Sequence, residues 1–139
     1  MSLTLSAAMT AIHDHFADTV WAGPVTVFGF ENEVIDPAPG LADSWVRFVV
    51  RETESGQETM GPVAGRNFLR KGLAILQIFT PSDLGRKPAD DLADTFKDGF
   101  EGVTVAGVRY HEVNRNVISQ DGRWFQLNAS AVFDYTERR

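Results

Sequence analysis

The chain has 139 residues, no cysteine and a net charge of -6, with 43% hydrophobic and 23% charged residues. This length suits one domain with one core, and the composition excludes disordered and fibrous proteins. The acidic balance argues against a protein that coats nucleic acid, because such surfaces neutralise phosphates with clustered basic side chains. The lack of cysteine excludes disulfides, thiolate metal sites and cysteine nucleophiles. We expect a single domain over residues 1–139.

A helix is the first predicted element, from residue 4 to about residue 20. Apolar residues recur there at spacings of three and four, and Ser2 or Thr4 can cap the N-terminus. His13 and His15 lie on this helix, but residues two positions apart are separated by about 200° around the axis, so they cannot bind one metal ion together. We interpret both histidines as solvated.

A short first strand and a long irregular loop are predicted next. A Gly-Pro pair ends the helix, and the β-branched stretch 25–28 predicts the strand. The loop, residues 29–40, contains two prolines and the acidic residues Glu31, Glu33 and Asp36. Long loops of this kind in compact domains tend to be functional.

A second strand followed by a flap is predicted from residues 44–65. Residues 44–52 alternate between two faces, and residues 54–57 predict a turn. The flap, residues 54–65, is rich in glycine and has few large apolar side chains, so it cannot bury enough surface to order itself. We predict that it is mobile and becomes ordered against a neighbouring subunit or a tube. The two strand faces carry Val46, Phe48 and Val50 on one side and Trp45, Arg47, Val49 and Arg51 on the other.

Three basic residues precede the most apolar stretch of the chain. Arg66, Arg70 and Lys71 come before a glycine, and between residues 73 and 79 the only polar side chain is Gln77. This short apolar run, followed by a proline, predicts a strand over 73–79. The apolar pattern does not explain the three basic residues that precede this strand.

A second helix is predicted to begin at Pro88. Asp90, Asp91 and Asp94 lie in its first turns, where the helix dipole favours anions, so we interpret them as structural residues and not as a metal site. Its apolar residues share one face, which consists of Ala89, Leu92, Ala93, Phe96 and Phe100.

Three strands are predicted in the C-terminal part of the chain. The first spans residues 103–111, and 114–119 and 124–135 form a hairpin around an Asp-Gly turn at 120–123. In the last strand, the side chains on one face are predicted to be buried in the core and those on the other face to be exposed to solvent. The element order predicts an α+β fold in which two helices pack on a largely antiparallel, mixed sheet. The predicted core residues of the last strand are Phe125, Leu127, Ala129, Ala131, Phe133 and Tyr135.

The motifs give no catalytic or cofactor site. The stretch GPVAGR at 61–66 lacks the Lys-Ser/Thr ending of a phosphate loop, and the acidic loop lacks the ligand spacing of a calcium site. His111 stands beside Glu112, but neighbouring strand residues point to opposite faces, so this pair is incidental. We therefore expect no enzymatic activity, no cofactor and no metal.

Several sequence segments occur in an order known from one family: FENEVIDP, SWVRFVV, a Gly-rich flap, FLRKGLAILQIFTPSDLGR, a helix containing LADTF, and DGRWFQLNASAVFDY. Together they resemble the phage tail terminator-like family, relatives of the tail terminator of long-tailed phages found in bacteriophages, prophages and gene transfer agents. The resemblance extends from about residue 5 to residue 136. The order of the segments, more than any one motif, carries it.

The resemblance implies a structural virion protein. Members of the family form a hexameric ring on the head-proximal end of the tail tube, stop its polymerisation and present a surface for head–tail joining. The implied partners are other copies of the chain, the tail tube protein and the head–tail connector or neck protein. DNA would pass through the lumen without specific binding, and an acidic lumen suits this passage because it does not hold phosphates. The sequence shows neither a membrane span nor a signal peptide, so we expect assembly in the host cytoplasm and residence in the virion tail.

A head-to-tail ring offers an explanation for the basic residues Arg66, Arg70 and Lys71, which precede the predicted strand 73–79. Opposite charges on two sides of one subunit are what such a ring requires. The alternative is a solvent-exposed strand end, whose charged side chains prevent pairing with the strands of other molecules. Trp45, Trp124 and Phe68 are candidate anchors at subunit contacts, with burial in the core as the alternative. We predict that the segment 66–71 projects from the sheet and contacts the acidic loop of the next subunit. The predicted contact joins Arg66, Phe68, Arg70 and Lys71 to Glu31, Glu33 and Asp36 of that subunit.

Two other functions stay open at this point. A head completion or neck connector protein of the same particle would form a similar ring of small domains. A small ligand-binding or hydrolytic α+β domain would use the polar cluster of Arg109, His111 and Glu112.

Overall fold

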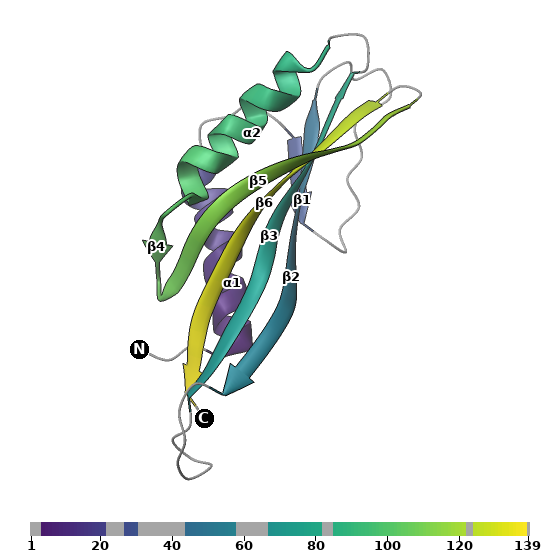
Figure 1. The fold of residues 1–139 in the computed structure, drawn as a ribbon. Helices are drawn as coiled ribbons and strands as arrows, with labels where there is room; N and C mark the ends of the chain where they lie inside the picture. Colours follow the sequence, from purple (N-terminus) through teal and green to yellow (C-terminus); the bar gives the residue numbers. More distant parts are fainter. Residues whose placement is uncertain are drawn as a thin grey trace.

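The computed structural model describes residues 4–21, 27–30, 44–57, 67–81, 85–121 and 124–138. Within this part of the chain, two α-helices and a π-helical turn accompany a six-stranded sheet (Figure 1). The helical elements are α1 (Leu5–His15), η1 (Phe16–Val20) and α2 (Lys87–Phe100). The strands are β1 (Val27–Phe30), β2 (Trp45–Gln57), β3 (Asn67–Pro81), β4 (Thr104–Val105), β5 (Val108–Asp121) and β6 (Trp124–Arg138).

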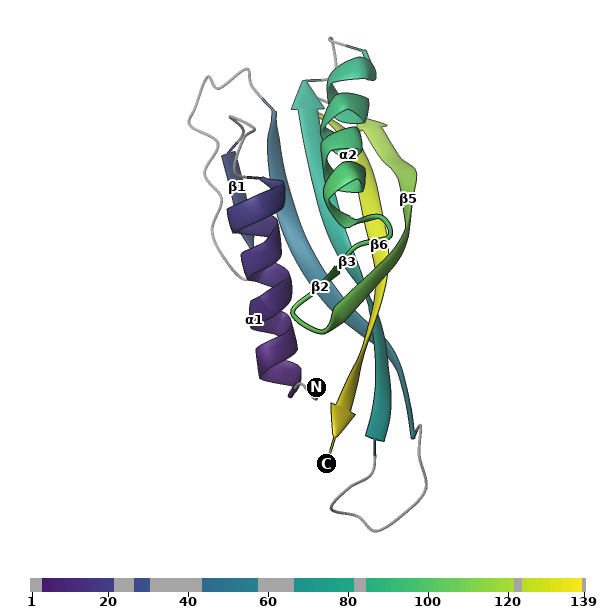
Figure 2. The same cartoon turned by 90° about the vertical axis from the view of Figure 1, so that its left-hand side faces the viewer.

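The sheet has the strand order β1-β2-β3-β6-β5-β4. β1 runs parallel to β2, and the other neighbouring pairs are antiparallel. Both α-helices lie on the same face of the sheet (Figures 1 and 2), which we call the inner face, and the opposite face is the outer face. This arrangement confirms the predicted α+β class with two helices on a largely antiparallel, mixed sheet.

The N-terminal helix follows its apolar pattern. The Thr4 hydroxyl accepts a hydrogen bond of 3.1 Å from the Ala7 amide, so Thr4 caps α1. Ala8, Ile12 and Phe16 are fully buried. The helix continues directly into the π-helical turn η1, which confirms a helical segment that extends to about residue 20.

α2 is an amphipathic helix with a proline in its first turn. Pro88 fits there because the amides of the first turn have no acceptor within the helix. The apolar side of α2 contacts η1, β3, β5 and β6. Ala89, Ala93, Phe96 and Phe100 are fully buried and Leu92 is partly buried, as the sequence predicts.

The core lies between the helices and the inner face. Phe48 of β2 is central to it, because its ring stacks on Phe16 with centroids 4.3 Å apart and also contacts Phe96 and Phe100 of α2. The alternation predicted for β6 is confirmed, since all six predicted core residues are buried: Phe125, Leu127, Ala129, Ala131, Phe133 and Tyr135.

β2 and β3 are longer than predicted. Residues 54–57 continue β2 and do not form a turn, and residues 67–72 belong to β3 and do not project from the sheet. β3 is paired with β2 on one side and β6 on the other, so strand hydrogen bonds satisfy its backbone along its whole length. A register shift between Glu52 and Glu54 keeps β2 paired to its end. Residues 58–66, the remainder of the predicted flap, lie outside the described residues.

The predicted strand 103–111 is wrong, because a tight turn divides it into two strands. Ala106 and Gly107 have positive φ angles of 53° and 85°, and the chain reverses there between β4 and β5. β5 then runs to Asp121 and includes the predicted strand 114–119.

Two further boundaries differ from the sequence prediction. β1 spans Val27–Phe30, whereas the predicted strand was 25–28, of which 25 and 26 lie outside the described residues. Asp121 and Trp124 are paired across the end of the β5–β6 hairpin, as the Asp-Gly signal predicts, and the two residues between them lie outside the described part of the chain.

Candidate functional site

An aromatic cluster occupies one end of the outer face. Trp45 of β2 lies opposite Phe79 of β3, and their rings stack with centroids 4.0 Å apart. Trp124 of β6 meets Trp45 edge to face at 6.2 Å. The indole Nε1 of Trp45 is buried and has no hydrogen-bond partner among the described residues. Leu73 and Ile75, which are partly exposed, extend this apolar surface along β3.

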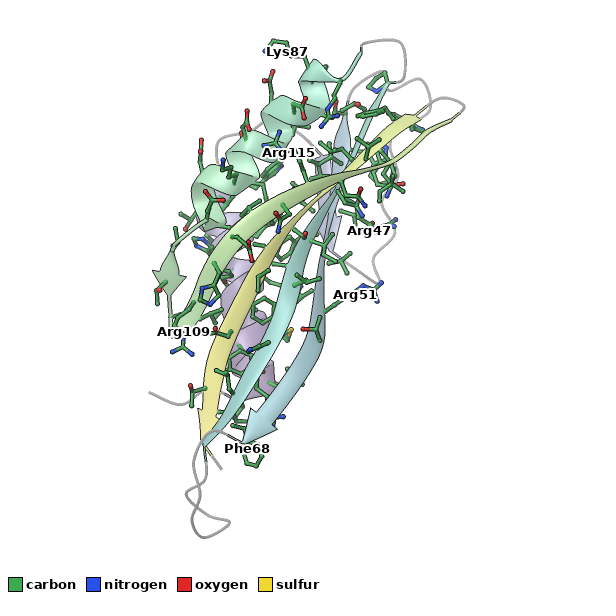
Figure 3. The ribbon with its side chains drawn as sticks, viewed as in Figure 1. Arg47, Arg51, Phe68, Lys87, Arg109 and Arg115 are labelled. Atoms are coloured by element: carbon green, nitrogen blue, oxygen red, sulfur yellow. The ribbon has the colours of Figure 1, made fainter. Side chains whose placement is uncertain are left out.

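Basic side chains share the outer face with the aromatic cluster, and one of them lies directly beside it. The guanidinium carbon of Arg47 lies 5.8 Å from the centroid of the Trp45 ring, a cation–π geometry. Arg47 and Arg51 project from β2 on the side away from α2 (Figure 3), and Lys71 lies on the same face of β3. None of these three forms an ion pair with another described residue. The other lysines and arginines with described side chains do: Arg70, Arg86, Lys87, Lys97, Arg109 and Arg115.

The structure divides the predicted basic cluster between the two faces of the sheet. Arg70 is on the inner face, where it forms an ion pair of 2.7 Å with Glu137 of β6 and lies 5.2 Å from the centroid of the Phe68 ring. Lys71 is on the outer face, so the two adjacent cations point to opposite sides of the sheet. The remaining members of the predicted contact, Arg66, Glu31, Glu33 and Asp36, lie outside the described residues. The subunit contact built from all of these residues stays a prediction.

Asp134 of β6 joins two basic side chains of β5 on the outer face. Arg109 donates a hydrogen bond through Nε to Oδ1 of Asp134, and Nε2 of His111 lies 2.7 Å from Oδ2. Burial opposes ionisation of Asp134, but the hydrogen bonds from His111 and Arg109 outweigh it, so the pKa of Asp134 lies below its usual value. Two members of the predicted polar cluster are thus brought together by a residue that the sequence analysis did not include. Glu112 is exposed.

His15 is buried, which corrects its interpretation as a solvated residue. Its Nε2 donates a hydrogen bond of 2.8 Å to the carbonyl oxygen of Gly99, at the C-terminal end of α2. Its ring stacks on Tyr110 and meets Phe100 edge to face. His15 therefore links α1 to α2 and β5. His13, in contrast, is partly exposed and bonds through Nδ1 to the carbonyl oxygen of Met9 within its own helix.

Two of the predicted acidic residues of α2 contact one arginine of β5. Arg115 donates hydrogen bonds to Asp90 at 3.1 Å and to Asp94 at 2.6 Å. The hydrogen bond from Arg115 lowers the pKa of Asp94. Asp91 pairs with Lys87 instead. Among the described residues, no group of three or more histidine, aspartate or glutamate side chains is placed to hold a metal ion.

A groove of about 730 Å³ lies between α1 and the turn that joins β4 to β5. It is on the helix side of the molecule, opposite the outer face. Two carboxylates in its lining make no ion pair with another described residue. The lining includes Ala7, Ala11, Val105 and Ala106 together with these carboxylates, Asp14 and Asp18.

Comparison with known proteins identifies the fold and no family. No protein-family model matches the chain, and no curated protein matches it. Among solved structures, one whose name states no function matches with a TM-score of 0.69, 13% sequence identity and coverage of 96% of this chain and 96% of its own. At that identity the likeness establishes a shared fold alone. No helix in the described part of the chain is long and apolar enough to cross a membrane.

Proposed function

We propose that this chain is a tail terminator-like structural protein of a phage or phage-like particle. Six copies form a ring at the head-proximal end of the tail tube, end the polymerisation of the tube and provide the joining surface for the head connector. The observation that carries the proposal is the outer face of the sheet, which combines stacked aromatic rings with cations that have no ion-pair partner among the described residues.

The composition of the outer face supports a role in assembly. A sheet with large apolar side chains on both faces needs cover on both, and the helices cover the inner face. Trp45 and Phe79 lie on the outer face beside Arg47, and aromatic and arginine side chains are the residues enriched at the energetic centres of protein interfaces. In the part of the chain that the structure describes, no helix covers the outer face (Figure 2), and a neighbouring protein would cover it.

The electrostatics of the cluster formed by Arg109, His111 and Asp134 support a structural role over a hydrolytic one. A general acid or base that works near neutral pH needs a pKa close to that pH. The pKa of Asp134 is lowered, and both of its carboxylate oxygens already accept bonds from Arg109 and His111. This geometry suits a salt bridge between two strands.

The net charge of -6 supports passage of DNA through a ring made of this chain. Acidic walls do not hold phosphates, so they would not retain the genome as it leaves the head. The partners in this proposal are the tail tube protein and the head–tail connector, and neither a cofactor nor a membrane is required.

Electron microscopy of particles made without this gene tests the proposal. We expect overlong or ragged tails beside filled heads that carry no tail, because nothing would stop the tube or join it to the head. Tails of normal length that fail only to join would assign the chain to the neck instead. Wholly normal particles would contradict both roles and return attention to the Arg109, His111 and Asp134 cluster.

A further inference from the structure

We infer that the outer face of one subunit docks on the α1 groove of a second copy of this chain, with Arg51 of the first near Asp18 of the second. The residues of the outer face that would make this contact are Trp45, Phe79, Arg47, Arg51 and Lys71. The α1 groove is the groove lined by α1 and the β4–β5 turn. This inference rests on the proposed ring and names the two surfaces that would build it.

The charged side chains that have no ion-pair partner among the described residues are separated by sign between two sides of the subunit. The cations without an ion pair to another described residue are all on the outer face. On the helix side, Asp14 and Asp18 line the α1 groove and Asp98 is exposed on α2, and none of the three forms an ion pair with a described residue. A second copy supplies the complementary charge to each surface.

The two surfaces are complementary in shape and polarity. The outer face presents bulky aromatic rings, and two of them, Trp45 and Phe79, stack on each other. The α1 groove is lined largely by small side chains such as Ala7, Ala11 and Ala106, which leave room for bulky ones. Burying aromatic rings against alanines removes apolar surface from water at both partners, and the charged residues at the rim fix the orientation.

The positions of the two surfaces suit the symmetry of a ring. The outer face and the α1 groove are on opposite sides of the sheet (Figures 1 and 2), so one subunit can offer both at once. A contact between two different surfaces is head to tail, and it repeats until it closes a ring or extends as a filament. A two-fold dimer would instead bury the same surface on both partners.

Cross-linking through introduced cysteines tests this contact without background, because the chain has no cysteine. The purified full-length double variant Asp18→Cys/Arg51→Cys is treated with a short bifunctional maleimide at high micromolar concentration. We expect a ladder of several rungs on a denaturing gel. The matched control is Asp18→Cys/Lys87→Cys, since Lys87 is 85% exposed at the far end of α2 and outside both surfaces (Figure 3). A double variant with no more product than this control overturns the inference, and so does a strong dimer from Arg51→Cys alone.

A charge exchange gives a second, independent readout. Arg51→Glu and Asp18→Arg should each weaken self-association roughly fivefold in sedimentation velocity, since each places like charges at the contact. Mixing the two variants should restore it, because in a ring that alternates them every contact again joins opposite charges. High salt should weaken the wild-type association. A mixture no better than either variant alone contradicts the contact, as does a wild-type chain that stays monomeric at every concentration.

These outcomes are separable from those of the proposed function. Overlong tails in particles without the gene, together with no ladder, would leave the terminator role standing and remove this contact. A ladder together with normal particles would leave the contact standing and remove the terminator role.

Discussion

The two faces of the sheet are completed in different ways. On the inner face, Phe48 is fully buried against rings from η1 and α2. On the outer face, Trp45 and Phe79 stack on each other, and the described helices lie on the opposite side. Because successive strand residues point to opposite faces, one strand such as β2 can hold the core together with one set of side chains and offer a partner surface with the other. The inner face accounts for the fold, and the outer face is where we place the function.

The largest effect on stability should come from removing a buried ring from the core on the inner face. We expect Phe48→Ala to lower the free energy of unfolding by about 3–5 kcal/mol, because it removes a fully buried ring and leaves a cavity among the aromatic residues of the core. Phe79→Ala on the outer face is the matched control and should cost only about 1–2 kcal/mol, since the ring is partly exposed. Urea unfolding of both variants measures the difference, and equal losses would contradict the distinction between the faces.

A smaller loss should follow from adding one methyl group to the inner face. A Cβ at Gly72 would overlap the carbonyl oxygen of Arg51 and the ring of Phe133, both of which are held in the sheet. We expect Gly72→Ala to cost about 2–3 kcal/mol in urea unfolding through overpacking. Gly56→Ala on β2 is the control, because nothing lies within 4 Å of its added Cβ. A neutral Gly72→Ala would show that β3 and β6 can separate freely at this point.

On the outer face, Asp134→Asn should change the response to acid. The lowered pKa of Asp134 means that its ionised form is stabilised in the folded state. That contribution is present above the unfolded pKa of about 3.9 and is lost as the pH falls through the lower folded value. We expect the variant to lose roughly 1 kcal/mol at pH 7 and to approach the wild type below pH 3, in urea unfolding at several pH values. Asp98→Asn, which removes an exposed carboxylate that has no ion pair among the described residues, is the matched control variant.

The smallest effect on stability should come from exchanging the ion pair on Arg70. The double variant Arg70→Glu/Glu137→Arg keeps an internal pair with reversed polarity, so thermal unfolding should change by less than about 0.5 kcal/mol. The same exchange places a carboxylate where the predicted contact with Glu31, Glu33 or Asp36 of the next subunit needs a cation. If that contact exists, tail joining should fail in particles that carry the variant. Normal joining would leave Arg70 with its internal role alone.

Local patterns in the sequence were enough to predict most of the fold. The 3.6-residue spacing in α2 and the strict alternation in β6 each identified the buried residues, because these signals depend on one element at a time. The full length of β3 could not be predicted this way. Its basic half is held by β2 and β6, whose pairing depends on contacts far apart in the chain. Likewise, positive φ at a non-glycine residue such as Ala106 leaves no clear signal in the sequence.

The residues of the candidate site were harder to predict for the same reason. His15 bonds to a carbonyl 84 positions away, and Asp134 meets a partner 25 positions away, so neither contact follows from spacing. The outer aromatic cluster did leave a signal, because Trp45 falls on the side of its strand opposite Phe48. Which of the two sides would be covered by helices became known only from the assembled sheet.

Cryo-electron microscopy of the head–tail junction in assembled particles tests the central claim most directly. The account predicts a ring of about six copies of this chain between the tail tube and the head connector, consistent with closed cyclic assembly. In each copy the outer face, with Trp45 and Phe79, should be buried against the neighbouring subunit. A junction that lacks the chain, or a ring in which the outer face is open to solvent, would contradict the account.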